Sequence, residues 1–119
     1  MRKKQSRPPA VHRQFVRRFP SLGTAWDLVN QEGGNGLLDH KTQRLLKLAI
    51  GIGALREGAV HSGVRKARDA GASLAEMEQV VALAASTIGF PASVAVWSWV
   101  REEAGGSAPA RMPRRRNRR

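Results

Sequence analysis

Residues 73–91 read SLAEMEQVVALAASTIGFP, and this stretch contains the signals for both the start and the end of a helix. Ser73 and Glu76 stand three residues apart, which is the spacing of a capping box, where each side chain satisfies a free backbone amide of the other residue. Apolar residues then recur at helical spacing through the rest of the stretch. Pro91 cannot continue this helix but suits the first turn of another. The stretch therefore predicts one complete helix and the start of the next.

Helical patterns continue on both sides of this stretch. We expect one helix to begin after Pro20 with Ser21 as its cap, because serine is a favoured N-cap residue. Two more are expected over residues 39–55 and 57–70, where apolar residues recur every three or four positions. No segment alternates with the period of two that marks a half-buried strand. The sequence therefore predicts an all-α protein, a compact bundle of about five helices.

The helix that follows Pro91 is apolar nearly all round its circumference. A chain of 119 residues forms one domain at most, and a domain of this size cannot bury the whole surface of that helix. A second copy of the chain is the simplest cover for the remaining apolar surface. We therefore expect a homo-oligomer.

The net charge of +12 is concentrated at the two ends of the chain. Residues 1–18 carry seven basic residues and residues 104–119 carry six, and neither segment contains an acidic residue. The other eight basic residues and all nine acidic residues lie in 19–103, so this central part is close to neutral. We expect a basic N-terminal arm over 1–18, a helical domain over 19–103 and an arginine-rich tail over 104–119, with both basic ends flexible.

The chain has no cysteine, which excludes disulfides, zinc–thiolate sites and thiol catalysis. Its three histidines are too few for a persuasive all-histidine site, so no metal and no other cofactor is expected. No apolar run is long enough to span a membrane, and the charged N-terminus is not followed by the apolar stretch of a signal peptide. These features predict a cytoplasmic protein.

The order and spacing of several motifs resemble the carboxymuconolactone decarboxylase family, which includes alkylhydroperoxidase D-like proteins. The matching stretches are Ala25-Trp26, LLDHKTQRLLKLA at 37–49, EGAVHSGVRKA at 57–67, AGAS at 70–73, Glu76-Met77, VVALAA at 80–85 and IGFPA at 88–92. The resemblance covers about residues 19–103. It implies a helical bundle that assembles into trimers or hexamers, and chemistry on a small organic acid or lactone without a cofactor.

The chain departs from this family at its catalytic positions. The peroxidase branch carries a Cys-x-x-Cys-x-x-x-His motif, whose three positions fall here on Arg56, Ala59 and Gly63. Thiol peroxidase chemistry is therefore excluded. The decarboxylase branch keeps a histidine at the position of Gly63, whereas the nearest histidine here is His61, whose side chain points about 200° away on a helix. Either the active site has shifted to His61, or the site has been lost.

The candidate catalytic pair is Glu57 and His61, which lie one helical turn apart and can share one face. Such a pair can act as a general acid and base, with Arg56 as a clamp for a substrate carboxylate. The plainer interpretation is a capping glutamate and an exposed i,i+4 pair without a catalytic role. Likewise, Lys41, Arg44 and Lys47 could line a pocket for an acidic ligand or simply form a solvated helix face.

The basic ends suggest a function of a different class. They carry the candidate polyanion-binding residues Arg2, Lys3, Lys4, Arg114, Arg115, Arg116, Arg118 and Arg119. Such a cluster can neutralise phosphates and bind nucleic acid with steep salt dependence, although an acidic protein, an anionic membrane surface and a purely solubilising role remain alternatives. Two hypotheses follow: a decarboxylase-like enzyme, and a catalytically silent oligomeric scaffold whose basic ends bind polyanions.

Overall fold

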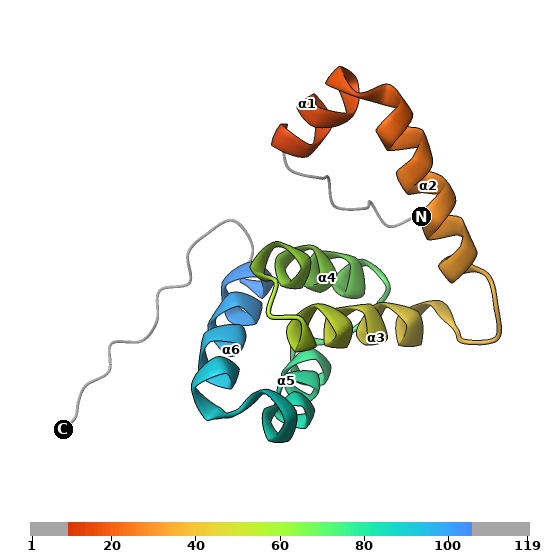
Figure 1. Ribbon diagram of the computed structural model, residues 1–119. Helices are drawn as coiled ribbons and strands as arrows, with labels where there is room; N and C mark the ends of the chain where they lie inside the picture. Colours follow the sequence, from red (N-terminus) through yellow and green to blue (C-terminus); the bar gives the residue numbers. More distant parts are fainter. Residues whose placement is uncertain (1–9, 106–119) are drawn as a thin grey trace.

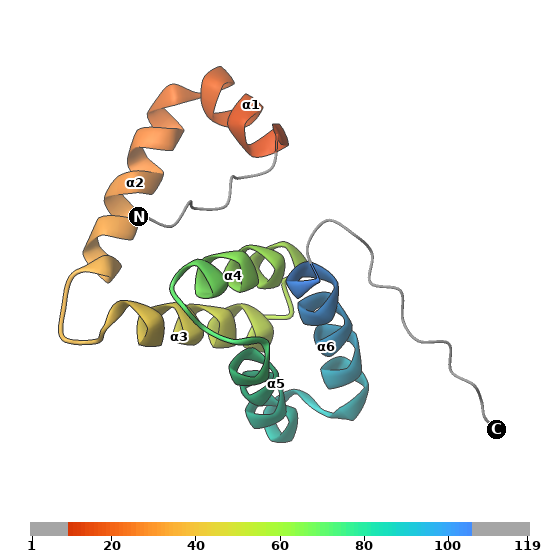
Figure 2. The same ribbon diagram turned by 180° about the vertical axis from the view of Figure 1, so that it is seen from behind.

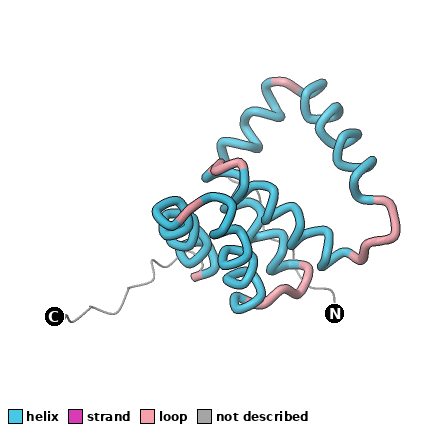
Figure 3. The backbone as a smooth tube through the Cα atoms, turned by 60° about the horizontal axis from the view of Figure 1, so that its bottom comes forward, coloured by secondary structure: helices cyan, strands magenta, loops and turns pink. Residues whose placement is uncertain are grey.

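The computed structural model describes residues 10–105 (Figure 1), and nothing but helices and short connections occurs within them. The all-α prediction is confirmed. The helices are α1 (Ala10–Arg18), α2 (Pro20–Gly34), α3 (His40–Gly53), α4 (Glu57–Asp69), α5 (Leu74–Ile88) and α6 (Phe90–Ala104). The connections between them are short, as the tube view in Figure 3 shows.

Helix α1 lies in the segment 1–18, which was expected from the sequence to be a basic arm, and residues 10–18 of that segment are helical. Val16 packs against Gly23 of α2, and the rings of Phe15 and Phe19 are 5.0 Å apart. These apolar contacts pair the two helices despite the high positive charge. Helix α2 begins at Pro20 with Phe19 at its N-cap position, because the fixed φ of proline suits the first helical turn. Ser21 therefore lies inside the helix and is not its cap.

Helices α3 to α6 form a four-helix bundle, with α3 packed against α4 and α5, and α6 packed against the same two helices (Figures 1 and 2). One continuous core lies between them. It consists of Leu48, Ile52, Val60, Val64, Ala67, Ala72, Met77, Val81, Val96 and Val100. The rigid bundle is what fixes the relative positions of polar side chains on different helices.

Helices α3 and α4 approach each other closely at two glycines. A Cβ placed on Gly63 would lie 3.2 Å from both the Cα and the Cδ1 of Leu48. At the other end of the contact, a Cβ on Gly51 would lie 3.2 Å from the Cβ of Ala59. Side chains at these positions would push the two helices apart, since contacts of this length are tighter than ordinary van der Waals separations.

The predicted capping box is present at the start of α5. The Glu76 amide donates to Ser73 Oγ over 3.1 Å, and the Ser73 amide donates to Glu76 Oε1 over 2.8 Å. Lys41 of α3 also pairs with Glu76 Oε2 at 2.8 Å. The hydrogen bonds from Lys41 and from the Ser73 amide lower the pKa of Glu76 because they stabilise its carboxylate. This cap therefore also ties α5 to α3.

Much apolar surface is left uncovered in the single chain. No residue of α1 or α2 is buried, and Phe15, Leu22 and Trp26 are each about half exposed. On α6, Phe90 and Val94 are exposed as well. Exposed apolar area of this extent is typical of interaction surfaces. Self-association stays a prediction. Within the described residues, no helix combines the length and the hydropathy that crossing a membrane requires.

Candidate functional site

One polar stripe of α4 faces the last turn of α6. It consists of Glu57, His61, Arg65 and Arg68, spaced three or four residues apart along the helix. Opposite the stripe lie Glu102 and Glu103, which are the acidic residues of α6. The core residues of both helices lie behind this polar contact. The packing of α4 against α6 therefore brings charged groups from distant parts of the sequence to one edge of the bundle.

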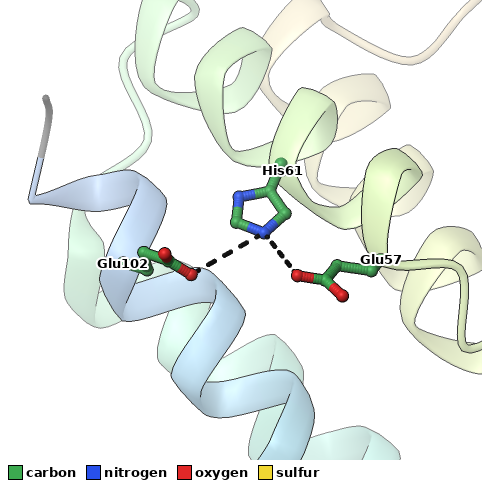
Figure 4. Close-up of side chains that lie close together, drawn as sticks. All are labelled: Glu57, His61 and Glu102. Atoms are coloured by element: carbon green, nitrogen blue, oxygen red, sulfur yellow. Dashed lines mark hydrogen bonds and ion pairs between the residues drawn. The ribbon is translucent and has the colours of Figure 1, made fainter.

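His61 lies at the centre of this cluster (Figure 4). Its Nδ1 is 2.8 Å from Glu103 Oε1. Its Nε2 is 3.3 Å from Glu57 Oε2 and 3.9 Å from Glu102 Oε1. The i,i+4 contact of Glu57 with His61 was expected from their spacing. The structure adds two carboxylates that sequence reasoning missed.

Two arginines hold the α6 side of the cluster in place. Arg65 Nη1 lies 3.4 Å from Glu103 Oε2, so Glu103 bridges Arg65 and His61. Arg68 Nη1 donates to the main-chain carbonyls of Glu103 and Ala104 over 3.2 and 3.4 Å. A cation near the last carbonyls of a helix stabilises them. These contacts fix the end of α6 against α4 and so fix the position of Glu103.

Burial divides the cluster into an inner and an outer half. The side chains of His61, Arg65 and Glu103 are only 20%, 19% and 22% exposed, whereas those of Glu57 and Glu102 are 57% and 68% exposed. The inner three are therefore held in place by their neighbours. The outer two carboxylates are free to change rotamer and face solvent on the Nε2 side of the imidazole.

This arrangement favours one role for each ring nitrogen. The short contact with Glu103 requires a proton on Nδ1, because both ring nitrogen and carboxylate would otherwise be acceptors. In the neutral ring, Nε2 then carries the lone pair and faces Glu57, Glu102 and solvent. A ring held in this way can exchange a proton with a molecule at Nε2, and the same lone pair and carboxylates are donors that can hold a metal ion.

The sequence was compared with protein families, with curated proteins and with solved structures. The model of the carboxymuconolactone decarboxylase family matches residues 20–102, which is most of the chain. The chain belongs to the carboxymuconolactone decarboxylase family. Neither the curated proteins nor the solved structures yield a match. The resemblance recognised in the sequence motifs is thus confirmed, and the match spans α2 to α6 nearly to its end.

In this member of the carboxymuconolactone decarboxylase family, the position of Gly63 has little room for a side chain. Gly63 packs against the backbone of Leu48 at the contact of α3 with α4. His61 lies two positions earlier and turns instead towards α6, where it contacts Glu103. The imidazole of this chain therefore lies on a different side of α4 from the position that carries the histidine in the decarboxylase branch.

The remaining sequence-predicted site residues are not part of the His61 cluster. Arg56 is exposed at the N-cap of α4, and no ion pair within the described residues joins its guanidinium to Glu57 or His61. All the candidate polyanion-binding residues lie outside the described residues. They are Arg2, Lys3, Lys4, Arg114, Arg115, Arg116, Arg118 and Arg119.

The predicted basic stripe of α3 divides between two environments. Arg44 and Lys47 line an open cavity of about 240 Å³ between α2 and α3, together with Trp26, whereas Lys41 pairs with Glu76. Partial desolvation, with repulsion from Arg44, Lys47 and Arg65, lowers the pKa of Lys66. Glu57 and His61 do not line this cavity, so it is separate from the His61 cluster.

Proposed function

We propose that this member of the carboxymuconolactone decarboxylase family performs acid–base chemistry at His61 on a small organic acid or lactone. The observation that carries the proposal is the position of the His61 ring between Glu103 at Nδ1 and Glu57 at Nε2. A half-buried imidazole oriented by a carboxylate is the arrangement that general acid–base catalysis requires. The part-buried contact with Glu103 argues against an exposed helix pair without a role.

In a decarboxylation, the bond between the carboxylate and its neighbouring carbon breaks and CO2 leaves. The electron pair remains on that carbon, which then takes up a proton. We assign the delivery of this proton to Nε2 of His61 in the doubly protonated ring, on its solvent-facing side. The ring is left neutral with its proton on Nδ1, and Nε2 takes up a new proton from solvent before the next turnover. Glu103 is a positioning residue in this account, since it holds the ring through Nδ1 and is itself held by Arg65. Glu57 stabilises the ring when Nε2 is protonated.

The charge of the cluster limits how a substrate can bind. Among residues 10–105, Glu57, Glu102 and Glu103 outnumber Arg65, which is the one permanently charged cation that pairs with their carboxylates. A substrate carboxylate placed against Nε2 would therefore be repelled. We propose that Arg56, one residue before Glu57 and exposed at the start of α4, holds a carboxylate away from the three glutamates. The uncharged lactone ring of the same substrate would then face Nε2.

The experiment is a turnover assay of the full-length protein after treatment with a chelator. A panel of small carboxylated lactones and keto acids is incubated in deuterated water, and NMR follows the loss of CO2 and the uptake of deuterium at carbon. We expect catalysed deuterium uptake for at least one carboxylated lactone. Rates equal to those of buffer across the whole panel would contradict the proposal.

A second candidate function is polyanion binding, and the observation that favours it is α1. This helix carries Arg13, Arg17 and Arg18, contains no acidic residue and continues the positive charge of residues 1–9 in a fixed shape. A scaffold of this kind should bind duplex DNA or RNA without sequence preference, and the affinity should fall steeply with salt. For six phosphate contacts, the affinity typically falls about 10³-fold between 50 and 200 mM salt. An affinity that does not change over this range would contradict polyanion binding.

A further inference from the structure

We propose that Glu57, His61 and Glu102 form a binding site for a divalent first-row transition-metal ion. Each offers one donor atom, and the three donors all lie within 4.8 Å of one another. Figure 4 shows the two carboxylates turned towards the same ring nitrogen from different helices. The inference goes beyond the proposed acid–base role and does not depend on it, because a metal ion and a proton compete for the lone pair of Nε2.

The separation of the Glu57 and His61 donors already matches a coordination sphere. Donors about 2.0–2.2 Å from a tetrahedral Zn²⁺ ion lie about 3.3–3.6 Å apart. Nε2 of His61 is 3.3 Å from Glu57 Oε2, which fits this range, and 3.9 Å from Glu102 Oε1. Glu102 is the most exposed of the three side chains, so a small change of its rotamer can close the remaining gap.

Glu103 supplies the feature that distinguishes this cluster from an ordinary group of surface acids. Metal-binding histidines donate their other ring N–H to a carboxylate, which fixes the tautomer and directs the free lone pair to the metal. The Nδ1 contact with Glu103 at 2.8 Å has this geometry, and Arg65 holds the far oxygen of Glu103. The imidazole is therefore set for coordination through Nε2 before any ion arrives.

The charges point to the same conclusion. In the neutral ring, Nε2 presents a lone pair to two carboxylates, and within residues 10–105 no Lys or Arg forms an ion pair with either of them. Arg65 lies on the Glu103 side of the ring and pairs there. A divalent ion at Nε2 would neutralise Glu57 and Glu102 together. A cation that neutralises two carboxylates in one small site removes the repulsion between them, and this favours cation binding.

The ligand types select the class of metal. Imidazole with carboxylates suits Zn²⁺, Mn²⁺, Fe²⁺ and Co²⁺, whereas Ca²⁺ and Mg²⁺ prefer sites made of oxygen donors alone. Three protein ligands leave at least one coordination position for water. No metal was expected from the sequence, since the chain has no thiolate ligands and too few histidines for an all-histidine set. Glu102 lies 41 positions after His61 and comes beside it only through the packing of α4 against α6.

The test is calorimetric titration of the chelator-treated, full-length protein with Zn²⁺, with the visible spectrum of bound Co²⁺ as a second readout. We expect one ion per chain at micromolar concentrations. His61→Ala should abolish binding, and Glu102→Gln, which changes an exposed side chain and leaves the fold intact, should weaken it at least about 10-fold. Glu103→Gln should weaken it about 10- to 100-fold through the orientation of the ring.

The matched control is the double variant His40→Ala/Glu32→Gln, which removes a histidine and a glutamate outside the cluster. It should bind Zn²⁺ as the unchanged protein does. The segments 1–9 and 106–119 contain no histidine, cysteine or acidic residue, so they offer no competing ligand set. Lack of binding by the unchanged protein, or an equal loss in the control and in Glu102→Gln, would overturn the inference. A failure of the turnover assay would leave it unaffected.

Discussion

The variant Gly63→His, which places a histidine where the decarboxylase branch of the family carries one, is expected to lower the free energy of unfolding by about 2–3 kcal/mol. A Cβ at this position already lies 3.2 Å from the Cα of Leu48, and the imidazole would extend beyond it. The clash is with backbone, so α3 and α4 would have to separate. Separation also disturbs the core contacts of Leu48, which is fully buried.

Gly58→His is the matched control for this variant. It makes the same change in the same helix, at an exposed position where an added Cβ meets no atom within 4 Å. Histidine is a better helix former than glycine, so Gly58→His should leave stability unchanged or raise it slightly. Denaturant unfolding of the three proteins gives the comparison. Equal stability of Gly63→His and Gly58→His would show that the α3–α4 contact is looser than described.

His61→Gln is expected to lower kcat about 10²- to 10⁴-fold on any substrate that the unchanged protein converts. Glutamine keeps a polar side chain of similar reach but cannot exchange a proton near neutral pH, so the acid–base role is lost. The measurement is the initial rate at saturating substrate, together with the unfolding midpoint. We expect the midpoint to change little, because His61 lies at the edge of the core and is partly exposed.

His40→Gln makes the same substitution at the start of α3, outside the cluster, and should retain full activity. A His61→Gln protein that keeps most of its kcat would remove His61 from the chemistry. In that case the cavity between α2 and α3, with its cations Arg44 and Lys47, would be the next place to look for the site.

Local signals in the sequence predicted most of the bundle. The capping box at Ser73 and the helix break before Pro91 were confirmed, because these signals depend on neighbouring residues alone. Helix α1 was missed because the high positive charge of residues 1–18 outweighed a real apolar pattern. Phe15 and Phe19 are one helical turn apart and their rings contact each other. Val16 packs against Gly23 of α2. That spacing was the signal that could have predicted it.

The candidate site was predictable only in part. The i,i+4 spacing of Glu57 and His61 predicted that their side chains meet, and they do at 3.3 Å. Glu102 and Glu103 could not be placed, because their contact with His61 depends on how α6 crosses α4. A hint was present, since two adjacent acids end a helix that is otherwise almost free of charge. The role of Arg56 stays a prediction, as do the basic ends of the chain.

The position of the ring proton on His61 tests the central claim most directly. Both the neutral ring left after proton delivery from Nε2 and the ring that binds a metal ion carry their proton on Nδ1 and a lone pair on Nε2. Long-range ¹H–¹⁵N NMR of the chelator-treated protein, at a pH where the ring is neutral, distinguishes the two tautomers. We predict that His61 carries its proton on Nδ1, bound to Glu103, and that Glu103→Gln increases the population of the other tautomer. A proton on Nε2 in the unchanged protein, with Nδ1 unprotonated, would contradict the account.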